Sequence, residues 1–257
     1  MGTEFGYVYD YEFSMVDEEE INSKHKAKKL KSNGSRVLLF DIRTNFIVVL
    51  RSDEGIRHEL IDSERYDTSV YDDEPDMFLC QHLLERLKDY WMTFPEIRTL
   101  TRSAFAFAKQ MAARPANERL RLIPVVVSLE VFTVQKEGES QEAVMERAIC
   151  SQRLIPLYLY PWPTVTEMPL KPIDDYVKLS VLSLPRARVE DTDQELARRM
   201  SVCHFCSKRA CVGDQIILLQ CNHAFHSHCG VPWLEDNSEC PLCDSIVYLK
   251  YNNTPNP

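Results

Sequence analysis

Cysteine and histidine crowd into one short stretch near the C-terminal end of this 257-residue chain. Residues 203–243 hold seven of the nine cysteines and four of the seven histidines. Paired cysteines with a two-residue gap can turn both thiolates toward one metal ion. The pattern C-x2-C, C-x-H, H-x2-C, C-x2-C supplies eight spaced donors: Cys203, Cys206, Cys221, His223, His226, Cys229, Cys240 and Cys243.

Zinc is the metal that this set of donors suits best. It takes four sulfur or nitrogen ligands in a tetrahedron, so eight donors suit two ions. A catalytic zinc site keeps one position open, whereas eight donors divide into two closed sets. Free cysteines in a small core are the alternative, but they give no reason for histidines at matching gaps. We therefore expect two structural zinc ions per chain.

The order and gaps of these donors resemble the RING finger of the two-histidine subclass, found in many ubiquitin ligases. The resemblance covers roughly residues 199–248. A PHD finger would place its single histidine fifth, and a LIM domain has different gaps. The family's cross-brace wiring implies one zinc on Cys203, Cys206, His226 and Cys229, and the other on Cys221, His223, Cys240 and Cys243.

Several residues that are not metal ligands also match the family. The resemblance implies that Phe205, Trp233 and Pro241 form a shallow apolar groove for a ubiquitin-conjugating enzyme. The alternative is that they fill a very small core, but exposed aromatic side chains in a small module usually serve an interface. The family often has arginine or lysine directly after the last cysteine, whereas this chain has Asp244.

The resemblance implies a RING-type E3 ubiquitin-protein ligase, whose partners are a conjugating enzyme, ubiquitin and a protein substrate. Such a ligase forms no covalent intermediate and acts by proximity and orientation, so we expect no catalytic residue. The remaining thiols, Cys80, Cys150 and Cys211, lack a neighbouring base at a readable spacing. A non-catalytic zinc-binding adaptor or scaffold is the alternative, and Asp244 keeps it open.

Charge and hydropathy bear on other classes of protein. The net charge of -9 and pI near 5.3 argue against a nucleic-acid-binding chain. The one basic cluster, residues 24–31, indicates a nuclear localisation signal, a local nucleic-acid contact or simply a solvated stretch beside the acidic residues 17–20. No apolar run approaches the roughly 20 residues of a membrane helix. With an acidic start unlike a secretory signal, we expect cytoplasmic and/or nuclear localisation and no membrane partner.

The rest of the chain must position or complement the finger. We expect an α+β fold: an N-terminal α+β domain of uncertain topology over residues 36–185, followed by the small cross-brace finger over 201–248. Residues 1–35 are expected to be a flexible lead-in, residues 186–200 a charged linker helix and residues 249–257 a tail. The first domain would then choose the substrate or set the assembly.

Periodicity suggests the elements of that first domain. Two β-branched runs in residues 36–51, separated at Thr44-Asn45, predict a hairpin or two consecutive strands. Residues 52–76 are acidic and rich in turn formers. Apolar spacing predicts helices over 77–94 and 98–113, with a possible further one over 141–151, and β-branched content predicts strands over 123–135 and 176–184.

Overall fold

The computed structural model describes residues 6–16, 35–52, 55–160, 175–189 and 200–248. Among these residues the chain forms two compact units, one ending at Val144 and the other beginning at Met145. Both mix helices with strands, as expected of an α+β protein. Within the described residues, no helix is long and apolar enough to cross a lipid bilayer.

The first unit is built on a four-stranded sheet in the order β1-β4-β2-β3. Its strands are β1 (Tyr7–Met15), β2 (Val37–Ser52), β3 (Gly55–Tyr71) and β4 (Leu122–Val134). The outer pairs, β1 with β4 and β2 with β3, are antiparallel. The central pair, β2 with β4, is parallel, so the chain must cross the sheet between them.

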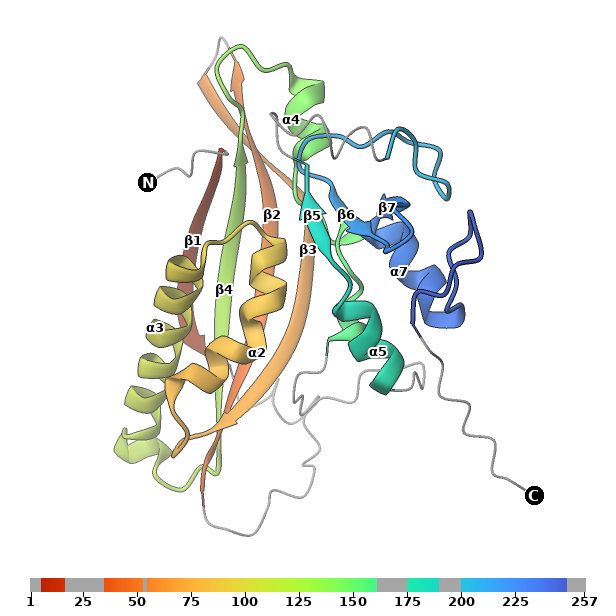
Figure 1. Cartoon of the computed structure of the whole chain (residues 1–257). Helices are drawn as coiled ribbons and strands as arrows, with labels where there is room; N and C mark the ends of the chain where they lie inside the picture. The colour runs from red at the N-terminus through yellow and green to blue at the C-terminus, as the bar shows by residue number, and fades with distance from the viewer. Residues whose placement is uncertain (1–5, 17–34, 53–54, 161–174, 190–199, 249–257) are drawn as a thin grey trace, which may run out of the picture. The chain divides into compact units, whose positions relative to one another are not determined.

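That crossover consists of two helices that cover one face of the sheet (Figure 1). Helix α2 spans Asp76–Asp89, and helix α3 spans Phe94–Ala112 and starts at a capping box between Thr93 and Glu96. A short 3-10 turn, η1 (Pro115–Asn117), follows α3. Three leucines one helical turn apart form the buried side of α2: Leu79, Leu83 and Leu87. The predicted helices are thus confirmed, and their apolar spacing is what buries them against the sheet.

Two expectations about this unit are wrong. The lead-in was expected to be flexible, but β1 lies within it and pairs with β4 along its whole length. Its aromatic residues alternate with polar ones, which is the period of a strand. Residues 36–51 were expected to form two runs with a break at Thr44-Asn45. Strand β2 instead continues through this point, where Thr44 and Asn45 each pair with both β3 and β4. The acidic stretch that follows is largely strand β3.

The second unit combines short elements from both sides of the zinc-binding stretch. Helix α4 (Gln141–Arg147) reaches the boundary between the units, and two 3-10 turns follow, η2 (Ser151–Arg153) and η3 (Leu157–Leu159). A three-stranded sheet has the order β5-β6-β7. The remaining elements are α5 (Asp175–Leu182), β5 (Arg186–Arg188), β6 (Gln215–Leu218), β7 (Ala224–His226) and α7 (Ser227–Asp236).

These elements differ from the expected boundaries. The first unit ends at Val144 rather than near residue 185, so residues 145–160 and 175–189 belong with the finger. The strand expected over 176–184 is helix α5. The expected linker helix begins instead with strand β5; residues 190–199 and the tail over 249–257 lie outside the described residues.

Candidate metal centre

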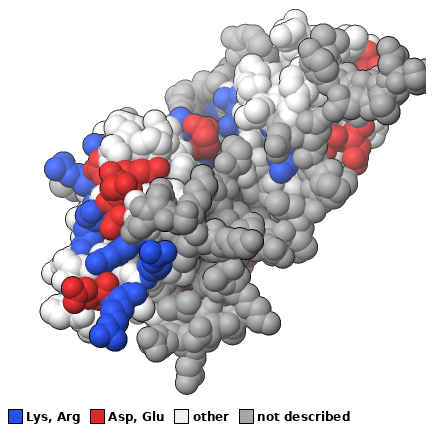
Figure 2. Space-filling view, turned by 90° about the horizontal axis from the view of Figure 1, so that it is seen from below, with Lys and Arg blue, Asp and Glu red and all other residues white. Residues whose placement is uncertain are grey.

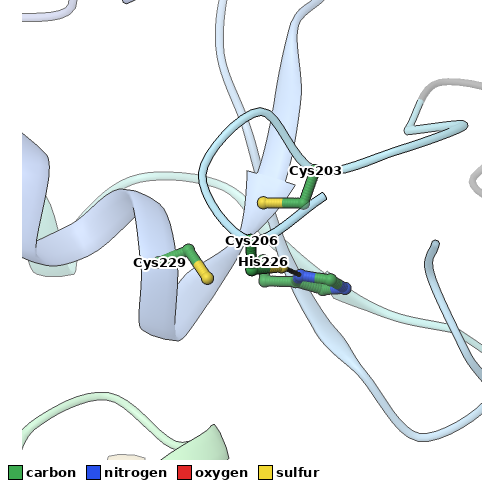
Figure 3. A group of neighbouring side chains, drawn as sticks. All are labelled: Cys203, Cys206, His226 and Cys229. Atoms are coloured by element: carbon green, nitrogen blue, oxygen red, sulfur yellow. Dashed lines mark hydrogen bonds between the residues drawn. The ribbon is translucent and has the colours of Figure 1, made fainter. Parts of the chain in front are cut away.

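The first group of donors consists of Cys203, Cys206, His226 and Cys229 (Figure 3). Their ligand atoms all lie within 4.8 Å of one another. The two leading cysteines lie on a tight turn, where the Ser207 N–H donates to the Cys203 carbonyl at 2.9 Å. His226 ends β7 and Cys229 lies in the first turn of α7. A tight turn, a strand end and a helix start therefore converge on one point.

The second group consists of Cys221, His223, Cys240 and Cys243. Nδ1 of His223 faces all three sulfurs, at 3.5 Å from Cys221 and 3.4 Å from each of the other two. A tetrahedron with zinc–ligand bonds of about 2.0–2.3 Å has edges of about 3.3–3.8 Å. The observed separations therefore fit a single zinc ion held by three thiolates and one imidazole.

The two groups interleave along the sequence, as the cross-brace wiring requires. The first and third donor pairs along the chain form one group, and the second and fourth pairs form the other. The eight donors predicted from sequence thus come together in the two expected sets of four, and these sets fit two structural zinc ions. Neither set leaves a position for a substrate, because four protein donors already complete the tetrahedron.

Comparison with known proteins agrees with this geometry. Residues 201–244 match the family model described as "Ring finger domain". This stretch is a RING-H2 finger. The human "E3 ubiquitin-protein ligase RNF126" is 44% identical over 55 residues, which are 21% of this chain and 17% of that protein. The Arabidopsis thaliana "RING-H2 finger protein ATL79" is 33% identical over 95 residues, 36% of this chain and 57% of that protein.

A solved structure, "Crystal structure of the RING-H2 domain of Arabidopsis RMR1", is also similar. It is 29% identical, covers 28% of this chain and 95% of its own chain, and aligns with a TM-score of 0.25. The matches to RNF126 and ATL79 span less than two thirds of either relative.

A close approach of helix α7 to strand β6 fixes the position of Cys229 in the RING-H2 finger. Gly230 follows this cysteine, and a Cβ atom there would lie 2.5 Å from Cδ1 of Ile217 and 3.2 Å from Cβ of Phe225. A larger residue at this position would require the Ile217 side chain to move. The first turn of α7 is thereby held against the hairpin that carries His226.

Asp214 connects the first metal site to the rest of the second unit. Its Oδ2 lies 3.3 Å from Nε2 of His226, an electrostatic contact rather than a well-aligned hydrogen bond. Nδ1 of the same ring lies 3.3 Å from Sγ of Cys206, on the metal side. A carboxylate at the outer nitrogen of a ligating histidine orients the ring and favours the tautomer that binds metal.

Asp214 is itself held in place by groups outside the metal site. The Cys211 N–H donates to its Oδ2 at 2.7 Å, and Arg153 forms an ion pair with its Oδ1. Burial alone would raise the pKa of Asp214, but His226, Arg153 and the Cys211 N–H hold that pKa at about 2. The carboxylate is therefore ionised at any physiological pH.

Residues N-terminal to the finger complete its sheet and its packing. β5 pairs antiparallel with β6, in the register Arg186 with Ile217. Backbone hydrogen bonds join Val189 to Gly213 and Asp214 at 2.8 and 2.9 Å, and the Tyr158 hydroxyl donates to Glu235 at 2.7 Å. The roles of Asp214, Arg153 and Tyr158 could not be predicted from the sequence, because their contacts are with residues far along the chain.

Two of the three residues of the expected groove, Phe205 and Trp233, lie side by side. Phe205 and Trp233 have ring centroids 5.9 Å apart, and Trp233 is 39% exposed. Pro241 is half-buried and is followed by the exposed Leu242. Phe225 lies beneath, fully buried, with its ring 5.2 Å from that of Phe205. The arrangement is an apolar surface backed by a small core.

Two cysteines outside the two clusters, Cys80 and Cys211, are poorly suited to catalysis. Cys80 is buried within α2 of the first unit. Burial, together with Asp214 and Glu146, raises the pKa of Cys211. A thiol that stays protonated is a weak nucleophile.

Proposed function

We propose that this protein is a RING-type E3 ubiquitin-protein ligase that recruits a charged ubiquitin-conjugating enzyme and promotes ubiquitin transfer to a substrate lysine. The RING-H2 finger, with both sets of metal donors in place, is the observation that carries the proposal. Similar proteins named E3 ubiquitin-protein ligases support it. Ubiquitin, the conjugating enzyme and a protein substrate are the partners that follow.

In this mechanism the chain positions reactants rather than reacting itself. The zinc ions hold the finger's loops in one conformation and do no chemistry. Phe205, Trp233 and Pro241 would bind the conjugating enzyme, so that its thioester lies near a lysine of a substrate held elsewhere on the chain. Holding two reactants in a productive orientation turns a bimolecular step into an effectively unimolecular one. The first unit is our candidate for choosing the substrate or setting the assembly.

Trp233→Ala tests the proposed groove. A central interface aromatic contributes roughly 2 kcal/mol or more, so affinity for the conjugating enzyme should fall at least about 30-fold. Zinc content, measured by metal analysis, should not change, because Trp233 donates to no metal. Leu179→Ala is the matched control, since Leu179 is also an exposed apolar residue but lies on α5. Loss of zinc together with binding would show that the tryptophan is core.

Asp244 is expected to limit the rate of transfer. The residue is exposed and has a left-handed backbone with φ of 55°, and its N–H donates to the Cys240 carbonyl at 2.9 Å. An ionised aspartate offers only acceptors, whereas arginine would offer donors to carbonyl groups of the conjugating enzyme and ubiquitin. Asp244→Arg should therefore accelerate ubiquitin discharge to free lysine without changing zinc content.

Asp244→Asn is the control for this experiment, because asparagine tolerates the left-handed conformation and removes the charge without adding a guanidinium. A wild-type protein that already discharges as fast as the arginine variant would show that this contact is not limiting. If wild type and both variants are inactive with every conjugating enzyme tested, the chain is a zinc-binding adaptor rather than a ligase.

A nucleic-acid partner is disfavoured in this proposal. From residue 201 onward, the sequence contains three basic residues and five acidic ones. Among the described residues visible in Figure 2, basic and acidic side chains are interleaved rather than gathered into a basic patch. Binding to phosphates requires clustered positive charge. We propose a protein-directed function in the cytoplasm and/or nucleus.

A further inference from the structure

The sheet of the first unit has two outer strands, β1 and β3 (Figure 1). The first part of β3, residues 55–60, is exposed throughout, including the side chains of Ile56 (72% exposed) and Leu60 (62% exposed). An exposed edge carrying apolar side chains is a ready template for pairing with another strand. The order of residues along this edge indicates which strand it would pair with.

The edge segment is complementary to itself when two copies run antiparallel about His58. Ile56 then lies opposite Leu60 of the second copy, and Arg57 lies opposite Glu59. Opposite charges and apolar pairs directly across an antiparallel ladder both stabilise it. Arg57 and Glu59 already contact each other within one chain at 3.3 Å, with side chains 64% and 46% exposed, so both are available to a partner.

The charged and the apolar side chains of this segment also lie on opposite faces of the sheet, which suits such a pairing. Within the hairpin Arg57 and Glu59 lie opposite Leu50 and Val48, on the face that carries the helices. Ile56, His58 and Leu60 lie on the other face, where the His58 ring meets Phe132 at 5.7 Å. Joining two copies would therefore extend an apolar strip on one face and a charged ladder on the other.

Two other pairings of the described edges place like charges together. A parallel, in-register pair of β3 strands would oppose Arg57 to Arg57 and Glu59 to Glu59. Strand β1, paired with itself about Tyr11, would oppose Asp10 to Glu12. Like charges directly opposite destabilise a ladder. Of these three pairings, the antiparallel β3 pairing about His58 is the one that opposes each charge to its opposite.

We propose that the protein self-associates as a symmetric dimer through the β3 edge, residues 55–60, with the sheets of two copies joined into one. The contact has a two-fold axis at His58, so each residue meets the same partner in both copies. The first unit would thus bring two RING-H2 fingers into one assembly. The dimer would form whether or not the protein is an active ligase.

Analytical ultracentrifugation of the full chain tests the proposal by charge reversal. Wild type should show a concentration-dependent monomer–dimer equilibrium. Arg57→Glu and Glu59→Arg each place two like-charge pairs at the interface and should weaken the dimer about tenfold or more. The two variants mixed together should associate with each other, because each supplies the charge that the other lacks. A folding defect could not produce that rescue.

Glu12→Arg is the matched control, because it makes the same charge change on the opposite edge strand and should leave the dimer intact. A wild-type protein that remains monomeric up to its solubility limit would overturn the proposal. So would a dimer that both single variants leave unchanged, or a mixture of the two variants that fails to associate. A dimer lost in Glu12→Arg would assign the contact to β1 instead.

Discussion

At the residue scale, the contacts of Asp214 tie metal binding to a part of the chain that supplies no ligand. Arg153 precedes the first zinc donor by 50 residues in the sequence, yet its ion pair with Asp214 lies next to the His226 ring. Removing a partner of this kind typically costs about 10- to 100-fold in metal affinity. Arg153 is thus a positioning residue that acts on the metal site through Asp214.

Arg153→Ala should speed zinc release to a chelator about tenfold or more, because Asp214 loses one of the groups that fix it against His226. The rate can be followed with a colorimetric zinc indicator. Arg209→Ala is the matched control, since Arg209 is basic and exposed in the same finger. Equal release rates from wild type and Arg153→Ala would contradict the assigned role.

The eight metal donors could be predicted from sequence because the spacing of a metal knuckle is a local property. Arg153 and Asp214 could not, because 61 positions separate them and neither has a distinctive neighbour. The role of Trp233 could be predicted from the sequence only in part. Its position matched the family, but its exposure depends on how Phe205 and Phe225 pack beneath it.

At the element scale, a buried charged network fixes helix α2 against strand β3. Arg86 is 1% exposed and forms a two-pronged ion pair with Glu64 of β3, whose side chain is also buried. The Tyr90 hydroxyl donates to the same carboxylate, and Asp89 lies 3.6 Å from the guanidinium. A buried ion pair adds little net stability, but breaking it leaves an unpaired charge in the core.

Arg86→Met should therefore destabilise the first unit by about 3–5 kcal/mol, since Glu64 would be left without its cation. The free energy of unfolding of this unit can be measured from hydrogen exchange in β4 peptides at increasing urea concentration. The control is Lys88→Met on the same helix, where an exposed pair with Glu85 is worth less than about 0.5 kcal/mol. A loss no greater than the control's would show that the network is dispensable.

Local sequence predicted most long elements of the first unit but not those that depend on distant partners. Helices α2 and α3 were predicted from their apolar spacing, and strand β4 from its β-branched residues. Helix α5 was expected to be a strand because of Val177 and Val181, yet Val181 is completely buried in a helix. Tertiary packing overrides the modest intrinsic preference of β-branched residues. Strand β5 gains its conformation only by pairing with β6.

At the scale of the whole molecule, the zinc-dependent part is larger than the finger itself. Zinc binding is coupled to folding in small metal-binding modules. The metal donors themselves lie within residues 203–243. However, β5 and Val189 make their backbone hydrogen bonds to residues between the zinc ligands. We therefore expect the zinc-dependent region to include residues 186–189.

Removal of zinc with a strong chelator should abolish hydrogen-exchange protection in β5 and β6 together, while β2 and β4 stay protected. Mass spectrometry of peptides covering each strand gives the measurement. The first unit contains neither group of metal donors, so its sheet has no direct dependence on zinc. Continued protection of β5 after zinc loss would mean that the second unit is not one cooperative region.

The pairing of β1 with β4 has a consequence for synthesis. Tyr7 pairs with Thr133, and Met15 pairs with Val125. During translation β1 leaves the ribosome before β4, which follows more than 100 residues later, whereas only two residues separate the end of β2 from the start of β3. Local hairpins close quickly and distant strands slowly. The nascent chain therefore carries an aromatic, unpaired strand until β4 emerges, and this is the interval when a chaperone would be needed.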